Sequence, residues 1–111
     1  MSNQAASYVK KLLFDAFQQE ASDIHFYPAT QCNEVAIYYR VLGSRQLKQK
    51  ISKAFYQLIL TYFKFSAAMD IGETRRPQDG TMSWYINHTE YYELRLSTLP
   101  LHESESLTIR I

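Results

Sequence analysis

The segment from Ala67 to Gly80 divides this sequence into two parts with different hydrophobic patterns. Before it, apolar residues recur at the spacing of an α-helix, and after it they alternate with polar residues as in β-strands. Gly72 tolerates backbone angles that other residues resist, and Pro77 lacks the amide hydrogen that a helix or an inner strand needs. The segment is therefore predicted to be an irregular connection, and its Asp-Gly pair at 79–80 is typical of a turn.

Two interpretations of this connection stay open. It is either a solvated helix-to-strand link, which is the usual fate of such a segment, or a surface that contacts another domain or subunit. The second interpretation would use polar side chains of the connection, which are Glu73, Arg75, Arg76, Gln78 and Asp79.

The first part of the chain is predicted to form one helix and two strands. Apolar residues at helical spacing indicate an amphipathic helix over about 3–20. Alternation of apolar and polar residues indicates strands over 22–28 and 35–41.

A hairpin and a second helix are predicted next. Gly43-Ser44 suits a two-residue turn with glycine first, and a short return strand would follow over about 45–48. Ser52 is typical of an N-cap, so the helix is predicted from there to about Ala67. Its predicted buried stripe, with Phe63 and Phe65 at its flanks, consists of Phe55, Leu58, Ile59, Tyr62 and Ser66.

Three more strands are predicted after the connection, over 81–86, 89–99 and 106–111. The order of elements indicates an α+β fold. We expect a mostly antiparallel sheet of about five to six strands, with both helices packed on it.

Composition limits the class of protein. The 111 residues suffice for one domain, and a net charge of +1 indicates that any anion-binding site is local. The single Cys32 cannot form an internal disulfide, which fits a reducing compartment. No signal peptide is visible, and the apolar run 54–65 is too short to span a bilayer. We therefore expect a cytoplasmic domain.

Two arginines form the most informative pattern. Arg95 and Arg110 fall on the polar faces of consecutive strands joined by a short turn, so antiparallel pairing would place both guanidinium groups on one side of the sheet. Guanidinium groups suit phosphate or carboxylate oxygens. The alternative is that they are ion-paired surface residues, for which Glu93 is a candidate partner.

Motifs of an independent catalytic site are missing. His25 and Asp23 share a strand face, but no nucleophile is identifiable near them, so a structural histidine is the favoured interpretation. The three glycines do not form a phosphate-binding loop, and no metal-ligand spacing surrounds Cys32. We expect this domain alone to catalyse nothing and to hold no metal.

Four sequence blocks together resemble one family. They are Ala-Ser-Asp-Ile-His-Phe-Tyr-Pro at 21–28, Tyr-Tyr-Arg-Val-Leu-Gly at 38–43, Ala-Met-Asp-Ile-Gly-Glu-Thr-Arg-Arg-Pro-Gln-Asp-Gly at 68–80, and Leu-Arg-Leu-Ser-Thr-Leu-Pro at 94–100 leading to Glu-Ser-Leu-Thr-Ile-Arg-Ile at 105–111. Their order and spacing resemble the N-terminal domain of the ATPases of type II secretion and type IV pilus assembly, the GspE/PilB-like group. Within that group the chain looks most similar to the ComGA-type competence ATPases of Gram-positive bacteria.

The resemblance implies a PAS-like fold, with helices on one side of a sheet, and a place in a hexameric ATPase that powers pilus assembly and DNA uptake. It implies that ATP and Mg²⁺ bind in a C-terminal RecA-like domain outside these 111 residues. By motif, Arg95 and Arg110 would approach the phosphates when the N-terminal domain closes over the nucleotide. The implied partners are that RecA-like domain, the other subunits and an inner-membrane platform protein, at the cytoplasmic face of the membrane, without direct nucleic-acid binding.

Some features differ from the family pattern or bear on the extent of the chain. Leu42 stands where the family commonly has aspartate, and the turn over 101–104 lacks the usual threonine and glycine. Met1 directly before the first helix, and an end within a strand at Ile111, lead us to expect the N-terminal piece of a longer protein without an additional leading domain.

Two rival functions are a PAS-like sensor or adaptor with a small-molecule pocket, and a partner-docking module that uses the arginines of the connection.

Overall fold

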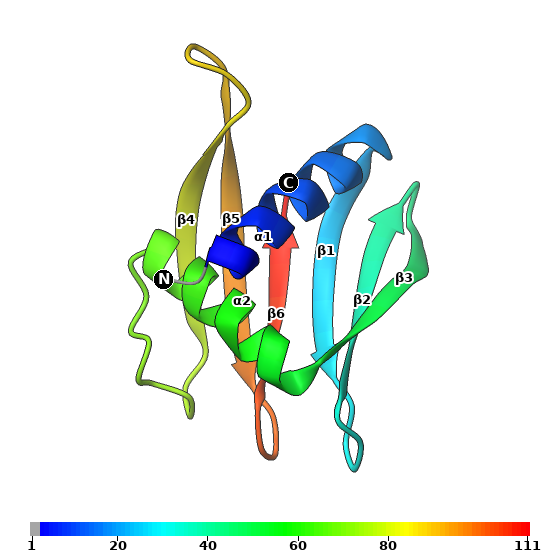
Figure 1. Cartoon of the computed structure of the whole chain (residues 1–111), viewed down its shortest axis with the longest axis vertical. Helices are drawn as coiled ribbons and strands as arrows, with labels where there is room; N and C mark the ends of the chain where they lie inside the picture. The colour runs from blue at the N-terminus through cyan, green and yellow to red at the C-terminus, as the bar shows by residue number, and fades with distance from the viewer. Residues whose placement is uncertain (1–2) are drawn as a thin grey trace.

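The computed structural model describes residues 3–111 of the chain, which form two helices and six strands (Figure 1). The elements in chain order are α1 (Asn3–Gln18), β1 (Ala21–Pro28), β2 (Glu34–Val41), β3 (Ser44–Ser52), α2 (Lys53–Ser66), β4 (Gln78–Tyr85), β5 (Tyr91–Pro100) and β6 (Glu105–Arg110).

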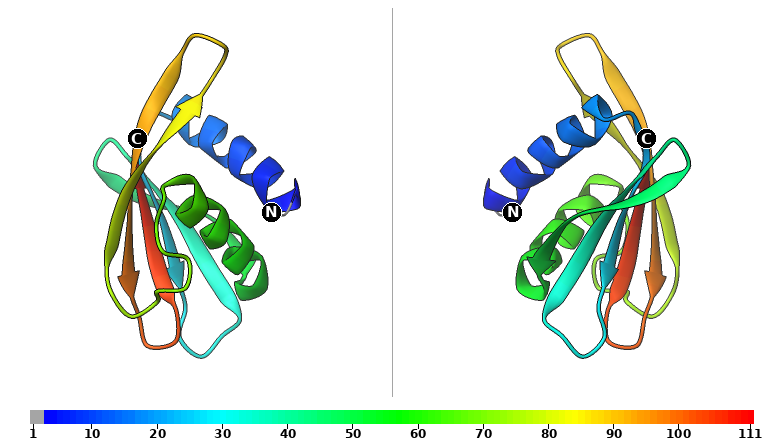
Figure 2. Two further views of the ribbon diagram at one scale, coloured as in Figure 1. Left: turned by 90° about the vertical axis from the view of Figure 1, so that its left-hand side faces the viewer. Right: turned by 90° about the vertical axis from the view of Figure 1, so that its right-hand side faces the viewer.

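All six strands form one antiparallel sheet in the order β3-β2-β1-β6-β5-β4. The last strand, β6, therefore lies between β1 and β5 and joins the first three strands to the hairpin of β4 and β5. Both helices cover the same face of the sheet, and the other face carries no helix (Figure 2). The predicted α+β class, with helices on one side of an antiparallel sheet, is confirmed.

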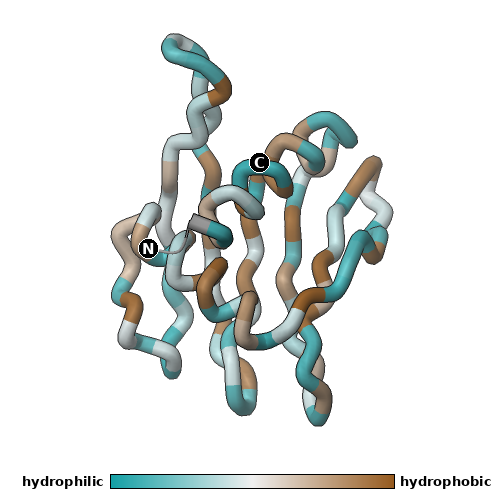
Figure 3. Tube along the Cα trace, viewed as in Figure 1, coloured by the Kyte–Doolittle hydropathy of each residue, from teal (hydrophilic) through white to brown (hydrophobic). Residues whose placement is uncertain are grey.

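The core lies between the helices and the sheet because the strands other than β3 turn most of their apolar residues toward the helices, as the alternation predicts. Hydrophobic positions accordingly follow the middle strands, and polar positions gather at the turns (Figure 3). Large aromatic rings fill the space under α2: the Phe26 ring lies 5.7 Å from the ring of Tyr56 and 6.3 Å from that of Phe63, measured between centroids. A filled core of this kind disfavours an internal ligand pocket.

The predicted buried stripe of α2 is correct only in part, since Ile59 is buried and Phe55 and Tyr62 pack half-buried against the core. The buried residues are Tyr56, Ile59, Leu60, Phe63 and Lys64, whereas the predicted Leu58 is exposed. Because this helix is apolar around most of its circumference, the sequence pattern does not fix its rotation. The preceding strand fixes the rotation of α2, since β3 runs directly into the helix. The Ser52 hydroxyl caps α2 by accepting a hydrogen bond from the Phe55 amide at 3.1 Å.

The hairpin after β2 also differs from the prediction. The turn residues are Leu42 and Gly43, with φ of +52° and +77°, and Val41 pairs with Ser44. Two positive φ values match a type I′ turn, not the glycine-first turn that was predicted. The return strand β3 extends to Ser52, well beyond the predicted 45–48, because it is a polar edge strand whose alternation is weak.

Asp79 and Gly80 do not form a turn, because β4 already begins at Gln78. Glycine is required at position 80 by a close approach: a Cβ there would lie 2.8 Å from the carbonyl oxygen of Ala67 and 3.2 Å from the Met69 Cε. The end of α2 therefore packs directly against this strand.

Candidate anion-binding site

Arg95 and Arg110 lie directly opposite one another on β5 and β6. Their neighbours Leu94, Leu96 and Ile109 are buried under the helices, so both guanidinium groups stand on the helix-free face of the sheet. The predicted placement of the two arginines on one side is confirmed. Like charges that face each other across a strand pair repel, and this makes the pair a favourable place for an anion.

The arginines border an open hollow of about 340 Å³, which we call the arginine hollow. The rest of its lining comes from Thr81, Ser97, Thr108 and Asp79, together with Gly80 and Leu96. Asp79 accepts a hydrogen bond from the Ser97 hydroxyl at 2.7 Å. Guanidinium groups only donate, and a threonine hydroxyl can donate or accept, whereas the Ser97 hydroxyl already donates to Asp79. The two arginines therefore suit the hollow to a ligand rich in acceptor oxygens.

The two arginines differ in their contacts. The Nε of Arg110 lies 3.3 Å from Asp23 Oδ1 on β1, whereas the Arg95 side chain makes no hydrogen bond or ion pair within residues 3–111. The predicted alternative of ion-paired surface residues holds for Arg110, with Asp23 as its partner. The candidate partner Glu93 pairs with neither arginine and accepts a hydrogen bond from Ser83 at 3.1 Å. Arg95 is therefore an unpaired cation at the edge of the arginine hollow.

His25 lies beside this site but has a structural contact. Its Nδ1 is 3.2 Å from the hydroxyl of Thr108, and its Nε2 is buried without a partner among the described residues. Burial lowers the pKa of His25 below its ordinary value, which favours the neutral ring. This contact agrees with the structural interpretation favoured from the sequence.

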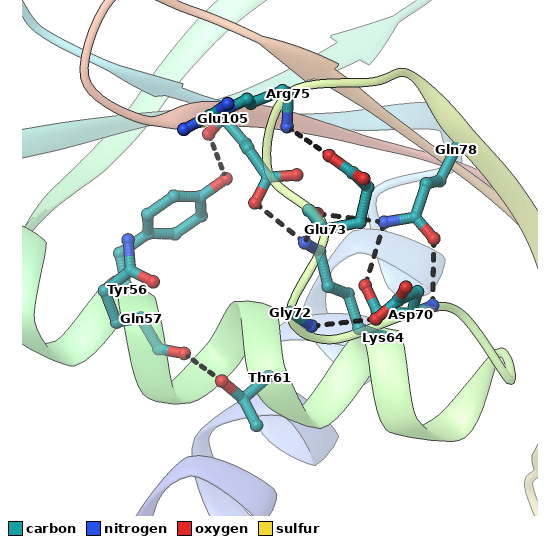
Figure 4. Close-up of polar contacts among 10 residues, drawn as sticks. All are labelled: Tyr56, Gln57, Thr61, Lys64, Asp70, Gly72, Glu73, Arg75, Gln78 and Glu105. Carbon is teal, nitrogen blue, oxygen red and sulfur yellow. Dashed lines mark hydrogen bonds and ion pairs between the residues drawn. The ribbon is translucent and has the colours of Figure 1, made fainter.

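The connection between α2 and β4 is held by its own side chains (Figure 4). Gln78 accepts a hydrogen bond from the Asp70 amide at 2.9 Å and donates to the carbonyl oxygens of Asp70 and Glu73 at 3.0 and 3.2 Å. The carboxylate of Glu73 accepts from the amide of Arg75 at 2.8 Å. Gln78 and Glu73 thus shape the connection, while Arg75 and Arg76 are exposed on it.

A buried ion pair under the connection was not predicted from the sequence. Lys64 and Glu105, 2% and 3% exposed, meet at 2.7 Å, and Lys64 also donates to the carbonyl oxygen of Glu73 at 2.9 Å (Figure 4). The hydroxyl of Tyr56 donates to the Glu105 carbonyl oxygen at 2.7 Å, and burial raises the pKa of this tyrosine. The predicted last strand begins at residue 106, so Glu105 lies outside it, and the sequence hints at the pair only through a lysine in a largely apolar stretch of helix.

Within the described range 3–111, neither helix is both long and apolar enough to cross a membrane, and no group of three or more His, Cys, Asp or Glu side chains could hold a metal ion.

Comparisons with known proteins identify the family to which the chain is similar. Residues 2–111 match the family described as "Type II/IV secretion system protein". The chain is 37% identical over 102 residues to "Competence protein ComGA" of Bacillus subtilis (strain 168), which covers 92% of this chain and 28% of that protein. It is 32% identical over 107 residues to "Type IV pilus assembly ATPase PilB" of Thermus thermophilus, covering 96% of this chain and 12% of PilB.

Among solved structures, the Legionella pneumophila ATPase DotB has a similar fold, with a TM-score of 0.68 over 94% of this chain and 28% of the DotB chain. At 15% sequence identity, this likeness shows the fold alone. The chain spans between 12% and 28% of the length of the proteins named here. The resemblance predicted from the four sequence blocks is confirmed, and the chain belongs to the type II/IV secretion system protein family.

Proposed function

We propose that this chain is the domain of a hexameric secretion ATPase that closes over bound nucleotide and transmits force. The observation that carries the proposal is the pair Arg95 and Arg110, opposite one another beside a hollow whose lining is largely polar residues. Their positive charge would stabilise the phosphates of ATP, as arginine fingers do in other nucleoside triphosphatases.

In this proposal the C-terminal RecA-like domain of the same protein holds ATP and Mg²⁺. The helix-free face of the sheet approaches that nucleotide, and the arginine pair closes on the phosphates. Release of the hydrolysis products lets the domain open. This rigid-body motion drives a platform protein at the cytoplasmic side of the membrane. The similarity to a competence protein and to a pilus assembly ATPase supports pseudopilus or pilus assembly, with DNA uptake, as the process served.

The experiment is the ATPase activity of the whole protein with Arg95→Ala or Arg110→Ala. Each change removes a charge that only closure brings to the phosphates, so we expect turnover to fall by a factor on the order of 10³. Arg45→Ala is the matched control, because Arg45 lies at the far edge of the same sheet face, stacked on Tyr38 at 4.1 Å. Wild-type turnover of both variants in correctly assembled hexamers would refute the arginine role.

The exposed arginines of the connection provide a second, separable part of the proposal. Gln78 and the Lys64–Glu105 pair fix the backbone that presents Arg75 and Arg76, so these cations occupy defined positions suited to carboxylates of a neighbouring domain or subunit. Reversing both charges to glutamate should impair assembly, measured by light scattering, more than nucleotide affinity. The opposite order of effects would exclude this contact.

A further inference from the structure

A row of polar residues crosses the helix-free face of the sheet, one from each strand, and five of the six are charged. Ladder partners define it without interruption, in the order Thr81, Arg95, Arg110, Asp23, Arg40 and Arg45. Asp23 is the one carboxylate of this row, and it lies between two arginines. Its neighbours are Arg110 of β6 on one side and Arg40 of β2 on the other.

The Asp23 carboxylate is fixed from several directions. Its side chain is only 10% exposed, Oδ1 lies 3.3 Å from Arg110 Nε, and Oδ2 lies 3.8 Å from Arg40 Nε. The hydroxyl of Ser22 donates to Oδ2 at 2.8 Å. A register shift between Ala21 and Asp23 places the extra residue Ser22 beside the aspartate, and β-bulges of this kind redirect side chains.

We propose that Asp23 is a positioning residue for the arginine pair: it holds Arg110 by Nε, so that the terminal amino groups of this guanidinium face the arginine hollow. This inference rests on the proposed function, because it assigns the hollow to a phosphate-rich anion. A guanidinium has five N–H donors in a fixed fork, and a contact at Nε leaves the four terminal hydrogens for the ligand.

Arg95 and Arg110, which together we call the anion grip, then have different tasks. Arg110, 68% exposed yet tethered to a nearly buried carboxylate, is the preoriented half. Arg95 has no such tether within residues 3–111 and is the half that adapts to the ligand. Preorientation reduces the entropy lost on binding, which is the benefit that the aspartate supplies.

The test uses this 111-residue chain, labelled with ¹⁵N and titrated with inorganic triphosphate, with the arginine Nε–Hε signals as the readout. In the free wild-type protein we expect the Nε–Hε group of Arg110 to be more ordered and slower in hydrogen exchange than that of Arg95. Triphosphate should shift both signals and leave Arg45 nearly unchanged. Asp23→Asn should weaken triphosphate affinity on the order of tenfold, by analogy with the loss of an outer-shell partner at metal sites.

The sign of this effect separates positioning from simple charge. Removing a carboxylate raises the positive potential of the face, so a pure charge effect would tighten binding. Asp79→Asn is the matched control, because Asp79 lines the same hollow and contacts Ser97 instead of an arginine. It should tighten triphosphate binding, and Asp23→Glu, which keeps the carboxylate, should recover most of the wild-type affinity.

Each outcome decides between the claims. Two outcomes would overturn the positioning role and leave the anion grip intact. One is tighter triphosphate binding by Asp23→Asn, and the other is an Arg110 Nε–Hε group as mobile as that of Arg95 in the wild type. The second measurement needs no variant, so it decides even if Asp23→Asn does not fold. Unchanged triphosphate affinity in Arg95→Ala and Arg110→Ala instead overturns the anion grip of the proposed function, and with it this inference.

Discussion

The ion pair of Lys64 and Glu105 shows how one residue contact ties three parts of the chain together. It joins the end of α2 to the start of β6, and the second hydrogen bond of Lys64 reaches the connection at Glu73. Removing two charges from water costs several kcal/mol each, and their attraction repays this only while both partners are present. Each partner is therefore needed chiefly because the other is buried.

Lys64→Met should lower the free energy of unfolding by about 3–5 kcal/mol, because it leaves the Glu105 carboxylate buried without its cation. The double variant Lys64→Met with Glu105→Leu should recover most of that loss, since an apolar pair of similar volume removes both desolvation costs. Urea denaturation measures both values. A double variant no more stable than Lys64→Met would show that the pair contributes through something other than charge compensation.

At the scale of elements, the turn between β2 and β3 is strained by its first residue. Leu42 has φ of +52° and is 93% exposed, so it gains almost nothing from burial while it occupies a conformation that L-residues avoid. Asparagine followed by glycine is the pair that this turn type prefers.

Leu42→Asn should therefore raise the free energy of unfolding by about 0.5–1 kcal/mol. Leu47→Asn is the control, because Leu47 is also exposed but lies in β3, where asparagine has poor strand propensity and should destabilise. Thermal unfolding of the two variants compares them directly. Equal changes of either sign would mean that exposure, and not backbone strain, governs the turn.

The contact between α2 and β4 depends on the absence of a side chain at position 80. Gly80→Ala would place a Cβ 2.8 Å from a backbone oxygen that cannot rotate away, so we expect a loss of about 1–3 kcal/mol in the free energy of unfolding. Gly72→Ala is its counterpart, since the nearest atom there is the Asp70 Oδ1 at 3.7 Å. Urea titrations that gave both alanines the same stability would contradict the close approach.

How much the sequence predicts depends on whether a feature is local. The shared face of Arg95 and Arg110 is predictable because a period of two and a short turn determine it. The rotation of α2 is not, because its apolar residues surround most of the helix, and β3 is underestimated because an edge strand can be polar on both faces. Lys64 and Glu105 are 41 positions apart, so their pairing depends on tertiary packing that no local pattern contains.

At the scale of the whole molecule, one core serves both helices and all six strands, so unfolding should be cooperative. The single tryptophan offers a test, because Trp84 packs near Phe17 of α1 and Tyr92 of β5, with ring centroids 6.0 and 6.2 Å away. Its fluorescence should report the hairpin of β4 and β5, while far-ultraviolet circular dichroism reports the whole chain.

The two denaturation curves should coincide, with one midpoint and one slope. A fluorescence transition at lower urea concentration would instead mean that this hairpin separates from α1 before the rest of the sheet unfolds.

The central position of β6 has a mechanical consequence. Because β6 is hydrogen-bonded to β1 on one side and to β5 on the other, a pull along its axis loads both ladders in shear. The backbone hydrogen bonds then bear the load at once, whereas a pull perpendicular to the strands would open them one after another. A force applied at Arg110 along β6 would thus move the whole sheet as one rigid body.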